Sequence, residues 1–404
     1  MPPELDVLIA GAGFSGTALA LALCREGVTV GLLDARGPLP PGGSTDARGL
    51  VMVPSSRRLL AHLGVWRDLA PYAAPIRHVH VSDRGHFGFT RFAADELGVP
   101  ELGHVCPADR LATALESALL TTAATLHWST RVLALRPDED GVSVDVAGPA
   151  GETTLRAKLL VGADGANSPV REYSGIATTR RDYGQTAIVA NLDVSRPAAA
   201  TAFERFTPDG PVAILPLADR RVVTVCTVKT EDADTVRALD DTAYLDYLQE
   251  RFGNRLGRFS KLGVRGAFPL ELVRAERVVA PRTVLAGNAA NAIHPNGAQG
   301  LNLGLRDVAV LAETIADAHA AGADPGAPAL LEAYAQRRRA QQRAVVLFSD
   351  SLARVFKSDF APLVGGRNAF MLALDLLPGV KRTLGRRLMG LSRLDSRFMA
   401  ADER

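Results

Sequence analysis

The sequence predicts an α/β protein in which a mainly antiparallel sheet is inserted into a parallel sheet, with a helical region at the C-terminus. Near the N-terminus, strand, glycine-rich turn, helix and strand follow one another, as in a βαβ unit. Between residues 183 and 267 several strands follow one another with one helical stretch among them, which is typical of an antiparallel sheet. After residue 340 the pattern is helical and basic.

The N-terminal segment has the pattern of a dinucleotide site. An apolar strand over residues 5–10 runs into Gly11-Ala12-Gly13-Phe14-Ser15-Gly16, a helix follows over 17–26, and a second apolar strand ends at Asp34. Gly11, Gly13 and Gly16 would allow a tight turn and close approach of a pyrophosphate, and Asp34 could accept a hydrogen bond from a ribose hydroxyl. The alternative, a plain tight βα turn, does not account for the acid at this spacing.

Two later loops also follow apolar strands. Gly162-Ala163-Asp164-Gly165 comes after residues 159–161, and Asp164 could accept a hydrogen bond from a ribose or ribityl hydroxyl. A turn-forming Asp-Gly pair is the alternative for this loop. The third loop begins at Gly287, after the strand over 283–286, and leads into a helical pattern from Leu301. A glycine-rich turn into a helix N-terminus favours an anion.

The inserted segment predicts strands at residues 187–192, 202–206, 212–217 and 221–228, with a helix over 242–252. Residues 76–92 alternate in polarity around a turn at residues 83–85, which predicts a hairpin. His78 and His80 share a face of this hairpin, but no third ligand is spaced near them, so no metal site is expected.

Bulk composition narrows the class of protein. The 404 residues are 47% hydrophobic and 22% charged, and the net charge of +2 argues against a nucleic-acid binder. The three cysteines form no CxxC pair, and each is expected in the core of a protein from a reducing compartment. A strand that begins at Leu5 leaves no room for a signal peptide, and apolar runs are too short to span a membrane. A cytoplasmic protein is therefore expected.

Taken in order, the GxGxxG turn, GADGxxS at 162–168 and GNAA…HP…GxQGxNxGxxD at 287–307 resemble the triple motif of FAD-dependent aromatic hydroxylases with the p-hydroxybenzoate hydroxylase fold. Three further stretches, 79–86, 203–207 and 361–368, resemble the 2-polyprenyl-6-methoxyphenol hydroxylase family of ubiquinone biosynthesis. The resemblance implies a Rossmann-like FAD-binding domain, an inserted substrate domain and a C-terminal helical region. The expected boundaries are 1–75, 101–180 and 268–340 for the first, 76–100 and 181–267 for the second, and 341–404 for the third.

The resemblance also implies roles for individual residues. Arg48 and Arg110 would contact the FAD, and Gly287 and Asn288 its diphosphate and ribityl chain, although the family more often has Asp where Asn288 stands. His294 and Pro295 would pack against the isoalloxazine ring and the reacting carbon, with the backbone of 297–302 around the pyrimidine end. For Arg48 and His294 the alternatives are a solvated loop arginine and a plain loop histidine. The cofactor residues expected are Gly11, Gly13, Gly16, Asp34, Arg48, Arg110, Asp164, Gly287, Asn288, Pro295, Gly297, Gln299, Gly300, Leu301 and Asn302.

The function implied is that of a monooxygenase that hydroxylates a polyprenylated methoxyphenol with O2 and NAD(P)H in ubiquinone biosynthesis. A single GxGxxG motif implies that NAD(P)H visits the site transiently, and the Trp-x-Trp motif of flavin halogenases is missing. Two alternatives stay open, a prenyl reductase of the same fold and a non-catalytic FAD-bound scaffold of a quinone-biosynthesis complex. No residue stands out as the group that activates the phenol, and a backbone carbonyl near Pro295 is one candidate.

The C-terminal region is basic, with 14 Lys and Arg against 6 Asp and Glu from residue 337 onward. A basic amphipathic tail suits the anionic inner face of a membrane, where a polyprenyl substrate dissolves, and could also contact other quinone-biosynthesis enzymes. The alternative is a helix packed on the flavin domain with a solvated basic face.

Overall fold

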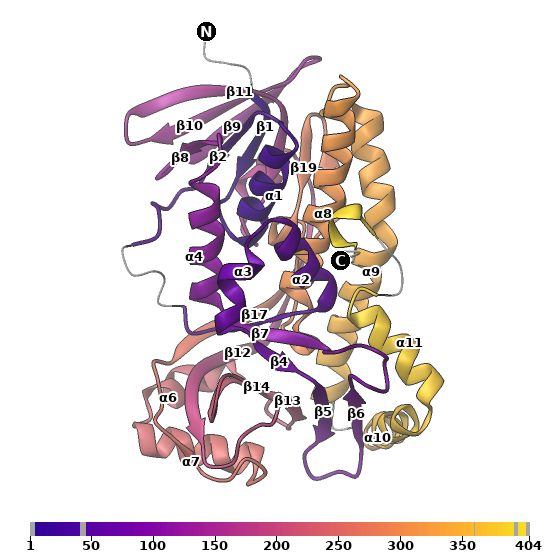
Figure 1. Ribbon diagram of the computed structural model, residues 1–404. Helices are drawn as coiled ribbons and strands as arrows, with labels where there is room; N and C mark the ends of the chain where they lie inside the picture. Colours follow the sequence, from indigo (N-terminus) through magenta and orange to yellow (C-terminus); the bar gives the residue numbers. More distant parts are fainter. Residues whose placement is uncertain (1–4, 41–45, 359, 392–394, 401–404) are drawn as a thin grey trace.

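Two sheets, one above the other in Figure 1, form the body of the protein, with two long helices along one side. The computed structural model describes residues 5–40, 46–358, 360–391 and 395–400. The predicted combination of a parallel sheet, a mainly antiparallel sheet and C-terminal helices is confirmed.

The first sheet has a parallel core in the order β19-β11-β1-β2-β8. Its central strand β1 is buried along its whole length, because it lies between β11 and β2 and helix α1 packs against it, which explains its mainly apolar sequence. An antiparallel extension, β9 and β10, pairs with the first part of the long strand β11. The members are β1 (Leu5–Ala10), β2 (Val30–Leu33), β8 (Thr125–His127), β9 (Arg131–Pro137), β10 (Val142–Gly148), β11 (Gly151–Gly162), β18 (Val279–Ala280) and β19 (Thr283–Leu285).

The second sheet runs β20-β17-β12-β15-β14-β13-β5-β6, and its neighbours are antiparallel except β13 and β5. Helices α6 and α7 pack on its lower part in Figure 1. The strands are β5 (His78–Asp83), β6 (Phe89–Ala93), β12 (Thr178–Val194), β13 (Thr201–Phe206), β14 (Val212–Pro216), β15 (Arg221–Lys229), β16 (Phe259–Ser260), β17 (Gly266–Ala275) and β20 (Asn291–Ala292), and the helices are α6 (Ala233–Ala238) and α7 (Asp241–Phe252).

A small third sheet lies between the two large ones in Figure 1. Its strands are β3 (Gly49–Met52), β4 (Ala74–Ile76) and β7 (Gly103–Pro107), and both outer strands pair antiparallel with β7. The helices of the first half are α1 (Phe14–Arg25), α2 (Pro54–His62), α3 (Trp66–Leu69), α4 (Ala108–Leu119) and α5 (Pro169–Tyr173).

The last third of the chain is helical. Helix α8 (Gln299–Ala320) packs against α9 (Pro328–Lys357), and the two are joined by a fully buried ion pair between Asp307 and Arg338 at 2.6 Å. Helices α10 (Ala361–Leu376) and α11 (Pro378–Leu388) follow, and α10 lies against the β5–β6 hairpin. Within the described ranges, no helix is both long enough and apolar enough to cross a membrane.

Candidate active site

The three glycine-containing loops meet at one edge of the parallel sheet. They follow β1, β11 and β19, which are adjacent and parallel, and Ala10 is in register with Gly162, which is in register with Leu285. Because the carboxyl ends of parallel strands share an edge, loops that are far apart in sequence become neighbours there. Ligands of open α/β sheets bind at this edge, where the chain leaves β1 in one direction and β11 in the other.

Close packing joins these loops to one another. Gly11 has a φ of 104°, and a Cβ at this position would collide with the carbonyl of Ala163 in the second loop. Gly287 has a φ of 60°, and a Cβ there would strike the side chain of Ser15 from the first loop. A Cβ on Gly13, in contrast, would meet no atom within 4 Å, so there is open space in front of the N-terminus of α1.

Arg171 ties the second and third loops together. Its guanidinium, only 4% exposed, donates to the carbonyl of Ala289 at 2.8 Å and to that of Ala166 at 2.7 Å. Burial and the nearby Arg180 lower the pKa of Arg171, but two carbonyl acceptors satisfy the charge. Nothing in the local sequence distinguishes this arginine from a solvated helix residue, so it was not predicted.

Asp34 lies directly under the first loop. Its Oδ2 accepts from the backbone N–H of Ala12 at 2.7 Å, and its Oδ1 accepts from the N–H and Nε of Arg36 at 2.8 and 3.1 Å. Burial would raise the pKa of Asp34, but these donors outweigh it and lower the pKa below its ordinary value. The carboxylate is therefore charged and fixes the end of β2 to the glycine-rich turn.

Asp164 has one oxygen bonded and one without a partner among the described residues. Oδ2 accepts from the backbone N–H of Val170 at 3.0 Å, whereas Oδ1 is buried without a hydrogen bond. Burial raises the pKa of Asp164 above its ordinary value. A buried acceptor of this kind needs a donor, which a hydroxyl of a bound molecule would provide.

The third loop is held by its own polar side chains. Asn302 accepts from the N–H of Val53 and the hydroxyl of Ser56, and donates to the carbonyls of Val51 and Ala298. Gln299 similarly accepts from Arg306 at 3.0 Å and donates to Gly297. The side chains of Gln299 and Asn302 are thus engaged within the protein, and the backbone N–H groups of Gln299, Gly300 and Leu301 in the first turn of α8 remain as donors.

His294 and Pro295 stand at the start of this loop. The His294 side chain is only 1% exposed, packs edge-on against Tyr183 and accepts at Nδ1 from the N–H of Asn296. Burial lowers its pKa to about 4, so the imidazole is neutral at pH 7. Pro295 is exposed, and its carbonyl accepts from the N–H of Ala298 at 2.8 Å.

Arg48, Arg110 and Asn288 are the remaining residues expected at the cofactor. Arg48 pairs with Asp46 at 2.6 Å and lies over the ring of Phe268 in β17. Arg110, at the start of α4, is half exposed and lies over Tyr72, and the carbonyl of Arg48 accepts from the N–H of Ala108 beside it. Asn288 is exposed in the third loop. The two arginines are therefore close in space although they are 62 residues apart in the chain.

The residues present fit an FAD molecule. Open space at Gly13 leaves room for a pyrophosphate, the buried Oδ1 of Asp164 can take a hydroxyl, and free N–H groups of α8 can take the polar edge of the flavin. Within the part of the chain that the structure describes, no group of three or more His, Cys, Asp or Glu residues could hold a metal ion.

Glu204 of β13 is a second residue at these loops that was not predicted from the sequence. Its Oε2 accepts from the N–H of Gly297 at 3.4 Å, so the second sheet reaches the third loop at this point. The signal was available, because Glu204 interrupts a strand whose other same-face residues, Ala202 and Phe206, are apolar.

Comparison with known proteins agrees with this geometry. Residues 4–349 match the model of an FAD binding domain family. The chain is 39% identical to ubiquinone hydroxylase UbiL of Rhodospirillum rubrum, over 96% of this chain and 90% of that protein. It is 31% identical to 3-demethoxyubiquinol 3-hydroxylase of Escherichia coli, over 96% of this chain and 98% of that protein.

A solved structure shows the same fold at a greater distance. The p-nitrophenol 4-monooxygenase PnpA of Pseudomonas putida superposes with a TM-score of 0.80 at 19% identity, over 98% of this chain and all of that one. The fold, the converging loops and the relatives that span nearly the whole chain agree with one another. The protein belongs to the FAD-dependent monooxygenase family that includes these ubiquinone hydroxylases.

Proposed function

We propose that this protein hydroxylates the aromatic ring of a polyprenylated methoxyphenol in ubiquinone biosynthesis, with O2 and NAD(P)H as co-substrates. The observation that supports it most is the contact between Gly297 and Glu204, because it joins the flavin loop to the second sheet around one site. The names of the relatives from Rhodospirillum rubrum and Escherichia coli support the substrate class.

In this proposal the three loops hold FAD. Gly11, Gly13 and Gly16 take the pyrophosphate, Asp34 and Asp164 take hydroxyls, and Gly287 and Asn288 take the diphosphate and ribityl chain. The backbone from Gly297 to Asn302 stabilises negative charge on the reduced ring, because a helix N-terminus favours an anion. Arg48 and Arg110 close the site, and the bound FAD, reduced by NAD(P)H, supplies the activation of oxygen. His294 and Pro295 lie at the flavin and substrate face.

The proposed substrate surface is the face of the second sheet on which the side chain of Glu204 lies. Val81 of β5 and Ala213 of β14 are the cross-strand neighbours of Glu204, and Val225 is the neighbour of Ala213 in β15. These aliphatic side chains would bury the ring and the start of the prenyl chain and exclude water. The proposed substrate domain is residues 76–100 and 181–267, inserted into a flavin domain of 1–75, 101–180 and 268–340, with 341–404 as a separate helical region.

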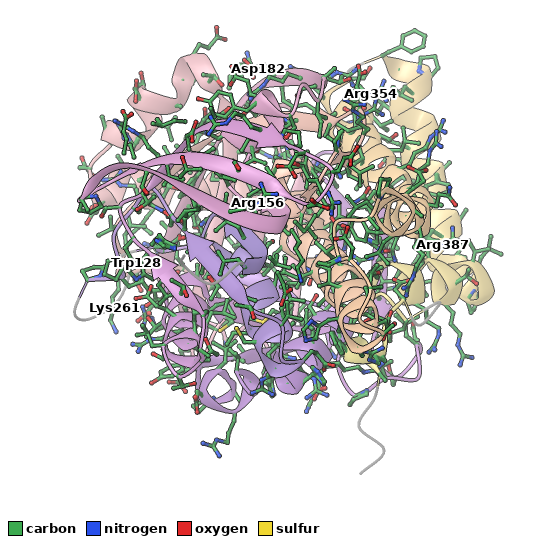
Figure 2. All side chains as sticks on the ribbon, turned by 90° about the horizontal axis from the view of Figure 1, so that it is seen from above. Trp128, Arg156, Asp182, Lys261, Arg354 and Arg387 are labelled. Carbon is green, nitrogen blue, oxygen red and sulfur yellow. The ribbon has the colours of Figure 1, made fainter. Side chains whose placement is uncertain are left out.

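We also propose that the C-terminal helices contact an anionic membrane surface. Exposed apolar side chains gather on α10, α11 and the adjacent turn of the β5–β6 hairpin; they include Phe370 at 63%, Leu376 at 68% and Phe87 at 63% exposure. Arg387 lies at the outer edge of the same helical side in Figure 2. Apolar side chains among basic ones are typical of interfacial helices, and this position would admit a substrate dissolved in the bilayer.

Two experiments test these proposals. Incubation with NAD(P)H and a short-chain 2-prenyl-6-methoxyphenol should give a product with one added oxygen, whereas saturation of the prenyl chain without oxygen uptake would indicate a reductase.

The membrane proposal is tested with the double variant Phe370→Asp, Leu376→Asp. Its affinity for anionic vesicles should be about tenfold lower than that of the wild type. Val264→Asp, at a position 82% exposed near the second sheet, is the matched control. Equal binding by all three proteins would contradict the membrane proposal.

A further inference from the structure

Glu204 points toward the flavin loop and not toward the core of the second sheet. Side chains alternate along β13, and Phe203 and Arg205 face α7, where Phe203 packs edge-on against Phe252 and Arg205 donates to the Phe252 carbonyl at 2.7 Å. Glu204 therefore lies on the opposite face, together with Phe206, which stacks on Phe356 of α9. Its Oε2 accepts from the N–H of Gly297 at 3.4 Å.

The surroundings of Glu204 leave its charge weakly compensated. Its cross-strand neighbours, Val81 and Ala213, carry no polar groups in their side chains. Burial raises the pKa of Glu204 to about 7, and the Gly297 N–H offsets only part of this. A carboxylate with this pKa exchanges its proton readily at neutral pH, which is the property a general base needs.

The charged groups on the elements around Glu204 have other partners. Asp83, two residues along β5 from Val81, is held by Arg367 at 2.9 Å and by Asn368 at 3.0 Å. Lys357 of α9 donates to the Tyr183 carbonyl at 3.0 Å. On the flavin loop, His294 is neutral because burial lowers its pKa to about 4.

Other groups near the loop are less suited to take a proton from a phenol. The Pro295 carbonyl already accepts from Ala298, and the Tyr183 hydroxyl donates to Asp350 at 3.1 Å. Glu204 has a second oxygen, Oε1, for which no protein hydrogen bond is found in the described chain, and the strand neighbours of Glu204 are the aliphatic residues Val81 and Ala213 of the proposed substrate surface. A carboxylate that ends on this surface, next to the flavin loop, is within reach of a ring bound there.

We propose that Glu204 is the general base that accepts the hydroxyl proton of the phenol; this rests on the proposed hydroxylase function. The phenol O–H bond breaks, an O–H bond forms on the carboxylate, and the released electron pair enters the ring, whose carbon bonds to one atom of O2 as the O–O bond breaks. The other oxygen atom leaves as water, with the two electrons that NAD(P)H supplies. The ring carbon then loses its hydrogen as a proton to solvent, the proton on Glu204 returns to the phenolic oxygen, and the carboxylate itself ends unchanged.

Glu204→Gln tests this role because the amide keeps an oxygen for the Gly297 N–H and cannot take a proton. In the oxidised protein without NAD(P)H, binding of a short-chain 2-prenyl-6-methoxyphenol should tighten about tenfold as pH rises through 7, since the carboxylate is the better acceptor. This dependence should vanish in Glu204→Gln. With NAD(P)H, hydroxylation should slow by about 10²- to 10⁴-fold, while FAD content and melting temperature stay unchanged. Glu204→Asp should restore part of the rate.

Each contrary result has a different meaning. If the wild type hydroxylates the phenol and Glu204→Gln does so with the same rate and pH profile, the role of Glu204 is overturned and the proposed function stays intact. Loss of FAD and of thermal stability in Glu204→Gln would overturn it too, because the residue would then only hold the Gly297 loop. A wild-type protein that hydroxylates no phenol would instead overturn the proposed function itself.

Discussion

Arg367 donates through Nε to Oδ2 of Asp83 at 2.9 Å, and the two residues are 284 positions apart in the chain. Both side chains are almost fully buried, and Asn368 donates to the same oxygen at 3.0 Å. The pair fixes α10 to the β5–β6 hairpin. Two of the stretches that carry the resemblance to the ubiquinone-pathway hydroxylases, residues 79–86 and 361–368, therefore meet at one buried ion pair.

Replacing Arg367 by Met should destabilise the protein, because Asp83 would stay buried without its charged partner. Loss of one member of a buried ion pair costs about 3–5 kcal/mol. The measurement is the free energy of unfolding in urea. Arg382→Met, on the exposed part of α11, is the control and should change it by less than about 0.5 kcal/mol. An equal loss of unfolding free energy in both variants would show that the Asp83–Arg367 ion pair does not stabilise the protein.

Gly13→Glu should give a folded but colourless protein. A side chain at Gly13 has open space, so the fold should survive, but a carboxylate there would repel the pyrophosphate of FAD. Flavin absorbance of the purified protein, together with its circular dichroism, gives the answer. Gly13→Ala, which adds no charge, should remain yellow. A yellow Gly13→Glu protein would refute the proposed position of the phosphates.

Arg171→Gln should lower both flavin content and stability, since the carbonyl of Ala289 would lose its donor and that of Ala166 the nearer of its two donors. Each buried carbonyl left without a partner costs about 1–3 kcal/mol. Arg180→Gln is a matched control from the same region, because Arg180 also contacts Ala166 but its side chain is 44% exposed. We expect the melting temperature and FAD content of that control to stay near wild type. A larger effect in Arg180→Gln than in Arg171→Gln would contradict this role.

Acid should destabilise the protein through His294. Its pKa is lowered to about 4 in the folded state against an ordinary 6.5, so below pH 6.5 the unfolded chain binds a proton that the folded chain does not. Stability should therefore fall as the pH drops from 6.5 toward 4, by roughly 3 kcal/mol for this group.

In His294→Gln the slope of unfolding free energy against pH between these values should be shallower. It should not vanish, because burial also lowers the pKa of His80 to about 4. An unchanged slope would mean that His294 is protonated in the folded protein.

Local patterns were enough to predict the N-terminal βαβ unit, because β1, its glycine turn and Asp34 are contiguous and each residue has one plausible environment. The helix expected over 242–252 is α7, from Asp241 to Phe252, and the hairpin over 76–92 is β5 and β6. The strand expected over 187–192 was too short. The observed strand, β12, runs from Thr178 to Val194. Its first half is charged and did not have the pattern of a strand, but ion pairs such as Arg180–Glu271 and Arg181–Asp350 satisfy these charges.

Long-range contacts explain what sequence could not show. Asn302 is expected at the flavin by resemblance, yet its side chain makes four hydrogen bonds within the protein, three of them to residues about 250 positions away. Arg171 and Glu204 gain their importance from partners in other loops, at Ala289 and Gly297. The residue pattern within one segment carries no information about partners that lie in another segment.

The most direct test of the central proposal measures oxygen uptake, NAD(P)H oxidation and product mass together, with purified FAD-loaded protein and a short-chain 2-prenyl-6-methoxyphenol. We predict that the phenol stimulates both rates and that the product gains one oxygen atom derived from O2. FAD-bound protein whose NAD(P)H oxidation and oxygen uptake do not respond to any prenylated phenol would contradict the account.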